Sequence, residues 1–187
     1  MKVICGLGNP GPEYDATRHN VGWWLVDRIS SEWRLGPFER RGPALVAGGA
    51  VGGHTVLLLK PVTFMNRSGA ALAPLLEDPE LDITRDLMVV VDDVALEPGR
   101  ARIRPSGSPG GHNGLRSVEA ALGTADYARL RIGVGSPPPG EGLVEWVLSP
   151  LLPEDEDAVL ALFPALVEGV RTWIDEGVEA AMSRTNR

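Results

Sequence analysis

Short apolar runs separated by polar turns are the first regular feature of this sequence. They predict strands at residues 3–7, 44–60 (a hairpin), 87–91, 101–104 and 130–134. The run at 87–91 is continuous, as in a central strand buried on both faces, and it ends in Asp92-Asp93. The hairpin turns at Gly52-Gly53, and the strand at 101–104 is expected on or near an edge of the sheet.

Apolar residues spaced three and four apart predict helices between and after these strands. The first helix begins at about residue 20. Further helices are predicted at residues 67–77, at about 115–122 and over most of 154–182. Asn20 is expected to cap the first helix, and Pro164 is expected to break or kink the last. Strands interleaved with helices indicate an α/β fold: one domain over residues 1–187, with a mixed, twisted β-sheet flanked by helices.

Composition excludes several classes of protein without naming one. The 187 residues suit a single domain, and 43% of them are hydrophobic. No apolar run approaches the roughly 18 residues that a membrane span needs, and the N-terminus lacks the pattern of a secretory signal. A lone cysteine, Cys5, excludes an internal disulfide and fits a reducing compartment.

Charge is distributed unevenly along the chain, whose net charge is −7. Residues 98–131 hold six arginines against two acidic residues, which gives this segment +4 and leaves −11 for the remainder. Arginine suits phosphate oxygens, and a phosphate backbone responds to local charge. By itself, however, the segment reads better as a solvated basic face.

The loop GLGNPG, residues 6–11, resembles a dinucleotide-binding turn directly after a strand. In such a turn the third glycine opens a helix whose amide groups meet the pyrophosphate. Here Pro10 and Pro12 bracket Gly11, and the helix begins only near residue 20. The glycines are therefore interpreted as a tight turn that presents Asn9.

Polar side chains follow several of the predicted strands. Loops at the carboxyl ends of strands share one edge of an open α/β sheet, where ligands bind. Each such residue alone suits a turn, but glycine-framed loops together offer a candidate site. Its members are Asn9, His19, Asn66 and Asp92, with His112 and Asn113 from a further loop.

The available side chains favour water activated by a general base. The sequence contains no G-x-S-x-G elbow for a nucleophilic serine, and Cys5 is interpreted as a small core residue. His19 and His112 with Asp92 or Asp93 could form a metal site, although no local ligand spacing supports it. A His19–Asp92 pair could instead accept a proton from water, which predicts a cofactor-free hydrolase of an activated carbonyl.

Four motifs carry a resemblance to a known family. GLGNPGPEYDATRHNVG, KPVTFMNRSG, VVVDDVALEPG and GGHNGLRSVEAALG, in this order, resemble bacterial peptidyl-tRNA hydrolases, from Val3 to about Met182. The resemblance implies a cytoplasmic, monomeric, metal-independent enzyme without a cofactor. Such an enzyme cleaves the ester between a peptide and the terminal ribose of tRNA, so that the tRNA can be reused in translation.

Transferred by position, the resemblance assigns roles to individual residues. It makes His19 the base, Asp92 its supporting carboxylate and Asn9 a contact of the peptide next to the ester. Substrate contacts are implied for another group of residues: Tyr14, Phe64, Met65, Asn66, His112 and Asn113. Phosphate contacts of tRNA are implied for Arg102, Arg104 and Arg131, which reverses the preference for a solvated face.

The resemblance also implies a mobile lid over the cleft at residues 136–152, followed by a C-terminal helical region at about 154–182. One position departs from the family pattern, because Ala95 stands where an acidic residue is common. Two other classes of function stay open, an RNA-binding module without catalysis and a metal-dependent esterase.

Overall fold

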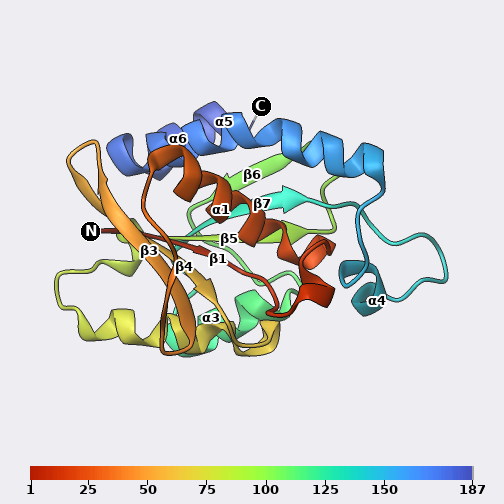
Figure 1. Cartoon of the computed structure of the whole chain (residues 1–187), viewed down its shortest axis with the longest axis horizontal. Helices are drawn as coiled ribbons and strands as arrows, with labels where there is room; N and C mark the ends of the chain where they lie inside the picture. The colour runs from red at the N-terminus through yellow and green to blue at the C-terminus, as the bar shows by residue number, and fades with distance from the viewer. Residues whose placement is uncertain (187) are drawn as a thin grey trace.

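The fold is a twisted sheet of seven strands with helices on both faces (Figure 1), as the computed structural model shows for residues 1–186. The strand order is β2-β3-β4-β1-β5-β7-β6. Strands β4, β1, β5 and β7 run parallel, whereas β2, β3 and β6 pair antiparallel with their neighbours. The predicted α/β class with a mixed sheet is confirmed.

The strands match the apolar runs closely. Their bounds are β1 Lys2–Gly6, β2 Glu39–Arg41, β3 Ala44–Val51, β4 His54–Pro61, β5 Leu87–Asp93, β6 Ala101–Arg104 and β7 Ala128–Gly133. The hairpin turns at Gly52-Gly53 as predicted, and β6 is an edge strand. Strand β2 was not predicted, because its three residues Glu39–Arg41 are exposed and carry no apolar signal.

The α-helices are α1 Val21–Trp33, α2 Ile83–Asp86, α3 Asn113–Leu122, α4 Leu143–Val147, α5 Pro153–Glu176 and α6 Val178–Thr185. Four 3₁₀ segments complete the description: η1 Pro12–Tyr14, η2 Arg18–Asn20, η3 Met65–Ala71 and η4 Ala73–Glu77. Among the described residues, no helix is both long enough and apolar enough to cross a membrane.

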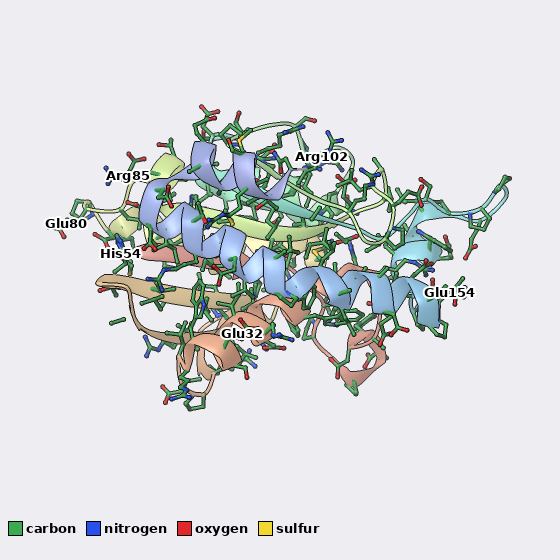
Figure 2. The ribbon with its side chains drawn as sticks, turned by 90° about the horizontal axis from the view of Figure 1, so that it is seen from above. Glu32, His54, Glu80, Arg85, Arg102 and Glu154 are labelled. Atoms are coloured by element: carbon green, nitrogen blue, oxygen red, sulfur yellow. The ribbon has the colours of Figure 1, made fainter. Side chains whose placement is uncertain are left out.

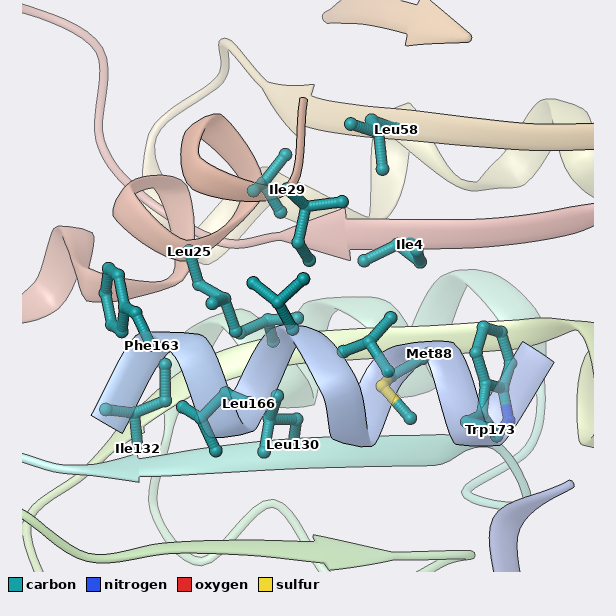
Figure 3. Close-up of a cluster of buried hydrophobic side chains, with 14 of the residues drawn as sticks. Ile4, Leu25, Ile29, Leu58, Met88, Leu130, Ile132, Phe163, Leu166 and Trp173 are labelled. Atoms are coloured by element: carbon teal, nitrogen blue, oxygen red, sulfur yellow. The ribbon is translucent and has the colours of Figure 1, made fainter. Parts of the chain in front are cut away.

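Side-chain alternation along the strands divides the core into two layers. On β5, Met88 and Val90 face a cluster with α1 and α5, whereas Leu87, Val89 and Val91 face α3 and η3. Figure 3 shows the first layer, in which strand residues meet side chains of α1 and α5. Helices α1, α5 and α6 cover one face of the sheet and α3 covers the other (Figure 1). Both faces of the central strands are buried, as their continuous apolar runs require.

Two helix predictions are corrected by the structure. The single helix expected at 67–77 is the pair of 3₁₀ segments η3 and η4, because Pro74 interrupts the backbone hydrogen bonds and Gly69 packs against the Ser117 carbonyl of α3. Pro164 does not break α5. It lies on the exposed side of the helix, while Phe163 and Leu166 on the buried side pack into the core and hold it.

Close packing of α1 on the sheet depends on glycine. A Cβ added at Gly22 would lie 2.5 Å from the carbonyl oxygen of Val90 and 2.8 Å from that of Leu7. Gly6 is equally restricted, because its Cβ would lie 2.4 Å from the Gly22 carbonyl oxygen. These contacts fix the start of α1 directly above the ends of β1 and β5.

Gly22→Ala is expected to lower the free energy of unfolding by about 2–3 kcal/mol, because backbone atoms cannot move aside as a flexible side chain would. Urea denaturation followed by circular dichroism measures this change. The matched control is Ser31→Ala on the exposed face of α1, expected to stay within about 0.5 kcal/mol of wild type. Equal stability of the two variants would contradict the tight approach.

Candidate active site

The carboxyl ends of the four parallel strands meet at one edge of the sheet, and the predicted polar residues gather there. Asn9 follows β1, Met65 and Asn66 follow β4, and Asp92 lies at the end of β5. His19 comes from η2, just before α1. The N-terminus of α3 adds His112 and Asn113 from the loop after β6.

Asp92 is the centre of this cluster. Its Oδ1 lies 2.8 Å from Nδ1 of His19 and 2.8 Å from Nε2 of His112, while Oδ2 lies 2.9 Å from Nδ1 of His19. The two imidazole rings are 4.9 Å apart between centroids. Asp92 is 3% exposed and His19 is 9% exposed, so the His19–Asp92 interaction is formed away from bulk water.

The backbone of α3 fixes the tautomer of His112. Nδ1 of this ring accepts hydrogen bonds from the N–H groups of Gly114, at 3.1 Å, and Leu115, at 3.3 Å, so that the side chain caps the helix. The ring proton is therefore on Nε2, which donates to Asp92. Asp92 also accepts from Nδ1–H of His19, which leaves Nε2 of His19 as the lone-pair nitrogen.

Electrostatics favour an ionised Asp92. Burial would raise the pKa of this carboxyl group, but the attraction and hydrogen bonds of His19 and His112 together hold it well below its ordinary value. For His19, burial lowers the pKa, whereas the charge and the hydrogen bond of Asp92 raise it, and the net result is a pKa above the ordinary value. The pair therefore combines a fixed negative charge with a histidine of increased basicity.

His19, Asp92 and His112 also form a group that could hold a metal ion. Their ligand atoms lie within 4.8 Å of one another, which is close enough for one ion. However, Nδ1 of His112 accepts two backbone N–H groups, so its Nε2 keeps the ring proton. A metal at that nitrogen would require either an imidazolate or the loss of the helix cap. The donor set therefore fits a hydrogen-bonded histidine pair better than a metal.

Asn9 is held by a residue that the sequence interpretation assigned to another task. Asn20 does not cap α1 with its side chain. Instead, its Oδ1 accepts from the backbone N–H of Asn9 at 2.9 Å, and its Nδ2 donates to the Asn9 carbonyl at 3.0 Å. Oδ1 of Asn9 accepts from the Met65 N–H at 2.7 Å. Among the described residues, the amide nitrogen of Asn9 has no hydrogen-bond partner, so it can bind a ligand. The role of Asn20 could have been suspected from the sequence only because Asn20 directly follows His19.

The remaining predicted contacts line a cleft beside His19. Tyr14 and Phe64 form an edge-to-face pair with ring centroids 6.5 Å apart, and Phe64 is 58% exposed. Met65 is buried beside them, and the exposed Asn66 and Asn113 line the same hollow. The structure thus brings all the predicted site residues except Arg102 and Arg104 around one histidine.

Helix α4 forms one wall of the cleft, and its side chains were not among the predicted site residues. Val144 and Val147 line the hollow beside Asn9 and Phe64, and they also line its continuation beside Asp92 and His112. The sequence of this stretch, LVEWVL, is amphipathic, but it does not indicate which side chains face His19. We call residues 136–152 the lid segment.

Arg131 lines the part of the cleft that contains His19 and Asp92, and all three predicted arginines surround a second hollow. Arg102, Arg104 and Arg131 line it together with Ser106 and Ser108. Arg131 is partly engaged, because its Nη1 lies 3.6 Å from Asp93 and its Nη2 donates to the Ser108 carbonyl. Asp93 is thus paired with Arg131 at the end of β5. Figure 2 shows Arg102 well away from Glu154 at the acidic start of α5.

Cys5 agrees with its interpretation as a core residue. Its thiol is fully buried within β1, and burial raises its pKa, so it is not a thiolate nucleophile.

Comparison with known proteins gives the family. The family described as "Peptidyl-tRNA hydrolase" matches residues 3–187. The chain belongs to the peptidyl-tRNA hydrolase family. A peptidyl-tRNA hydrolase of Gemmatimonas aurantiaca is 46% identical over 193 residues, covering 100% of both chains. One of Symbiobacterium thermophilum is 47% identical over 188 residues, covering 99% of this chain and 98% of the relative.

Solved structures agree with this assignment. The crystal structure of peptidyl-tRNA hydrolase from Acinetobacter baumannii superposes with a TM-score of 0.92 at 30% identity, covering 100% of this chain and 94% of that one. The enzyme class expected from the motifs, a peptidyl-tRNA hydrolase, is confirmed by the family match. The fold of the hydrolase is confirmed by the superposition.

The His19–Asp92 pair predicts a pH-dependent contribution to stability. Because the folded pKa of His19 is raised above its unfolded value of about 6.5, the contribution is complete below about pH 6.5 and is lost as the pH rises through the folded value. Asp92→Asn should remove it, so the wild type should lose its advantage in unfolding free energy over this variant as the pH rises from about 6.5 through the folded pKa of His19.

Urea denaturation at several pH values measures this difference. Asp93→Asn is the matched control, since Asp93 is the adjacent carboxylate but pairs with Arg131 and not with a histidine. A difference between wild type and Asp92→Asn that stays constant with pH would show that His19 gains nothing from Asp92.

Proposed function

We propose that this hydrolase cleaves the ester of peptidyl-tRNA with a water molecule that His19 activates as general base. The observation that supports the proposal most is the arrangement of His19. Its Nδ1–H donates to the buried, ionised Asp92, which leaves the lone pair of Nε2 for a proton from water.

The reaction then follows with atoms and charges balanced. Nε2 of His19 takes a proton from water while the oxygen attacks the ester carbonyl carbon, forming a tetrahedral oxyanion. The bond between this carbon and the ribose oxygen breaks, and the imidazolium returns its proton to the leaving oxygen. The products are a peptide carboxylic acid and tRNA with a free terminal hydroxyl group, and no cofactor enters the balance.

Asparagine side chains are suited to the uncharged parts of this substrate. Asn9, fixed by Asn20 and Met65, offers its amide nitrogen to the peptide carbonyl next to the ester. Asn66 and Asn113 line the same cleft and can hold the substrate, the water or the developing oxyanion without adding a charge. His112 supports the reaction through Asp92, since its Nε2–H shares the carboxylate with His19.

Aromatic and basic side chains account for the tRNA. Tyr14 and Phe64, with Met65 beside them, offer an apolar surface for the aminoacyl end and the terminal adenosine. Arg102, Arg104 and Arg131 lie in a position to meet phosphates of the acceptor stem. Among the described residues, Arg102 and Arg104 have no carboxylate partner, so their charge is free for a polyanion.

The proposal includes three further expectations from the family resemblance: the hydrolase is cytoplasmic, it is a monomer, and it acts without a metal ion. The acidic remainder of the surface would repel tRNA elsewhere and restrict docking to the face that carries these arginines.

His19→Ala is expected to lower the cleavage rate of N-acetyl-aminoacyl-tRNA by about 10²–10⁴-fold, because the proton acceptor is removed, while tRNA binding is retained. For the wild type, kcat/KM should rise with pH with an apparent pKa above about 6.5. His54→Ala, at a half-buried histidine outside the cleft that pairs with Asp175, is the matched control and should cleave normally.

Two other outcomes would replace the proposal. Loss of wild-type cleavage on addition of EDTA would indicate a metal-dependent esterase. Binding of tRNA by the wild type without any cleavage would indicate an RNA-binding module.

Arg102→Ala and Arg104→Ala are each expected to weaken binding of non-cleavable aminoacyl-tRNA and to reduce the slope of log affinity against log salt by about 0.7–0.9, the value for one phosphate contact. Filter binding at several salt concentrations measures the slope. Arg40→Ala is the matched control, because β2 lies at the opposite edge of the sheet from β6. An unchanged slope in both variants would place the tRNA on another face.

A further inference from the structure

Arg18, the residue before His19, is a buried cation without an ion pair. Its side chain is large and the residue is only 2% exposed. Among the described residues, no carboxylate lies within ion-pair distance of it, although Asp155 and Glu141 act on it from further away. A guanidinium is costly to bury unless its hydrogen bonds are met, so its partners indicate what it is for.

Those partners belong to the lid segment. Nη1 of Arg18 donates to the carbonyl oxygens of Trp146, at 3.2 Å, and Ser149, at 3.3 Å, and to Oγ of Ser149 at 2.5 Å. The guanidinium carbon lies 3.4 Å from the centroid of the Trp146 indole, which is a close cation–π contact. The indole N–H donates in turn to the Gly135 carbonyl at 2.8 Å. One side chain thus holds the C-terminal end of α4.

The backbone next to Arg18 adds to this connection. Its own N–H donates to the Ser149 carbonyl at 3.1 Å, and Thr17 forms an isolated β-bridge with Pro150. Thr17 and Arg18 are therefore joined to the lid segment by main-chain contacts as well as by the guanidinium. The side-chain clamp can be removed by mutation while these main-chain bonds keep His19 in place.

The clamp determines what covers the general base. Trp146 faces Arg18, whereas Val144 and Val147 face the cleft, where they line the hollows on both sides of His19. Figure 1 shows α4 beside the short helical turns that precede α1, near the edge of the sheet at which the parallel strands end. If α4 moved outward, the apolar wall beside His19 would be lost and the base would be open to bulk water.

We propose that Arg18 is a positioning residue of the hydrolase, which clamps α4 so that Val144 and Val147 form the substrate-binding wall beside His19. The proposal rests on the hydrolase activity and assigns Arg18 no contact with the reacting atoms. Its guanidinium is directed to Trp146 and Ser149, and it makes no hydrogen bond to Asp92. Its effect therefore passes through α4, and the proton transfer at His19 is left unchanged.

Arg18→Met tests the proposal, because methionine keeps much of the apolar stem and removes the charge and every N–H donor. KM for N-acetyl-aminoacyl-tRNA is expected to rise about tenfold, with kcat within about threefold of wild type and the pH profile unchanged. Arg18→Lys should restore only part of the affinity, because an ammonium cannot stack as a plane while bonding three oxygens. Arg171→Met is the matched control, because Arg171 is a half-buried arginine that pairs with Asp175 on α5, away from the cleft.

Hydrogen exchange measured by mass spectrometry gives a readout that does not depend on catalysis. Arg18→Met should increase exchange of amides in residues 143–149 and leave those of β5 protected. Trp146→Leu should produce the same increase, and the double variant should add little to either single one, because both remove one clamp.

The outcomes separate the clamp from a merely structural role. A lower kcat with unchanged KM, in proportion to the loss of folded protein, would overturn the proposal, as would unchanged exchange at 143–149. If the wild type cleaved no ester, the function proposed above would fail, and the exchange data alone would decide whether the clamp exists.

Discussion

A carboxylate buried at the end of a central strand must find hydrogen-bond donors on every side, and Asp92 obtains them from two separate segments of the chain. His19 lies in η2 and His112 directly precedes α3, and both rings donate to the same carboxyl group. Without them the buried charge would be too costly to keep. The hydrogen bonds that Asp92 requires thus fix where η2 and the start of α3 must lie, and with them the position and tautomer of His19.

The sheet makes this arrangement possible. Parallel pairing of β4, β1, β5 and β7 brings their carboxyl ends to one edge, so residues distant in sequence meet there. The close approach of Gly22 to Val90 places the start of α1, and therefore η2, directly above the end of β5. Packing in the core and chemistry at the edge are consequently parts of the same constraint.

The polar residues on either side of His19 make specific hydrogen bonds that hold other parts of the site. Asn20 uses both ends of its amide to bind the backbone of Asn9, and Arg18 donates from Nη1 to the lid segment. The motif residues on either side of His19 thus hold, respectively, the residue expected to contact the peptide and the helix that covers the cleft.

The sequence by itself determined the strands, most helices and the set of side chains at the site, because hydrophobic periodicity is local and motif residues keep their spacing. Two predictions failed for local reasons. The exposed strand β2 lacks an apolar signal, and the break expected at Pro164 does not occur because the neighbouring residues Phe163 and Leu166 are held in the core. Only the tertiary structure decided which polar atoms meet. The pairing of His112 with Asp92, of Asn20 with Asn9 and of Arg18 with Trp146 joins segments brought together by the fold. Such contacts depend on the direction of a side chain in space, which no spacing along the chain encodes.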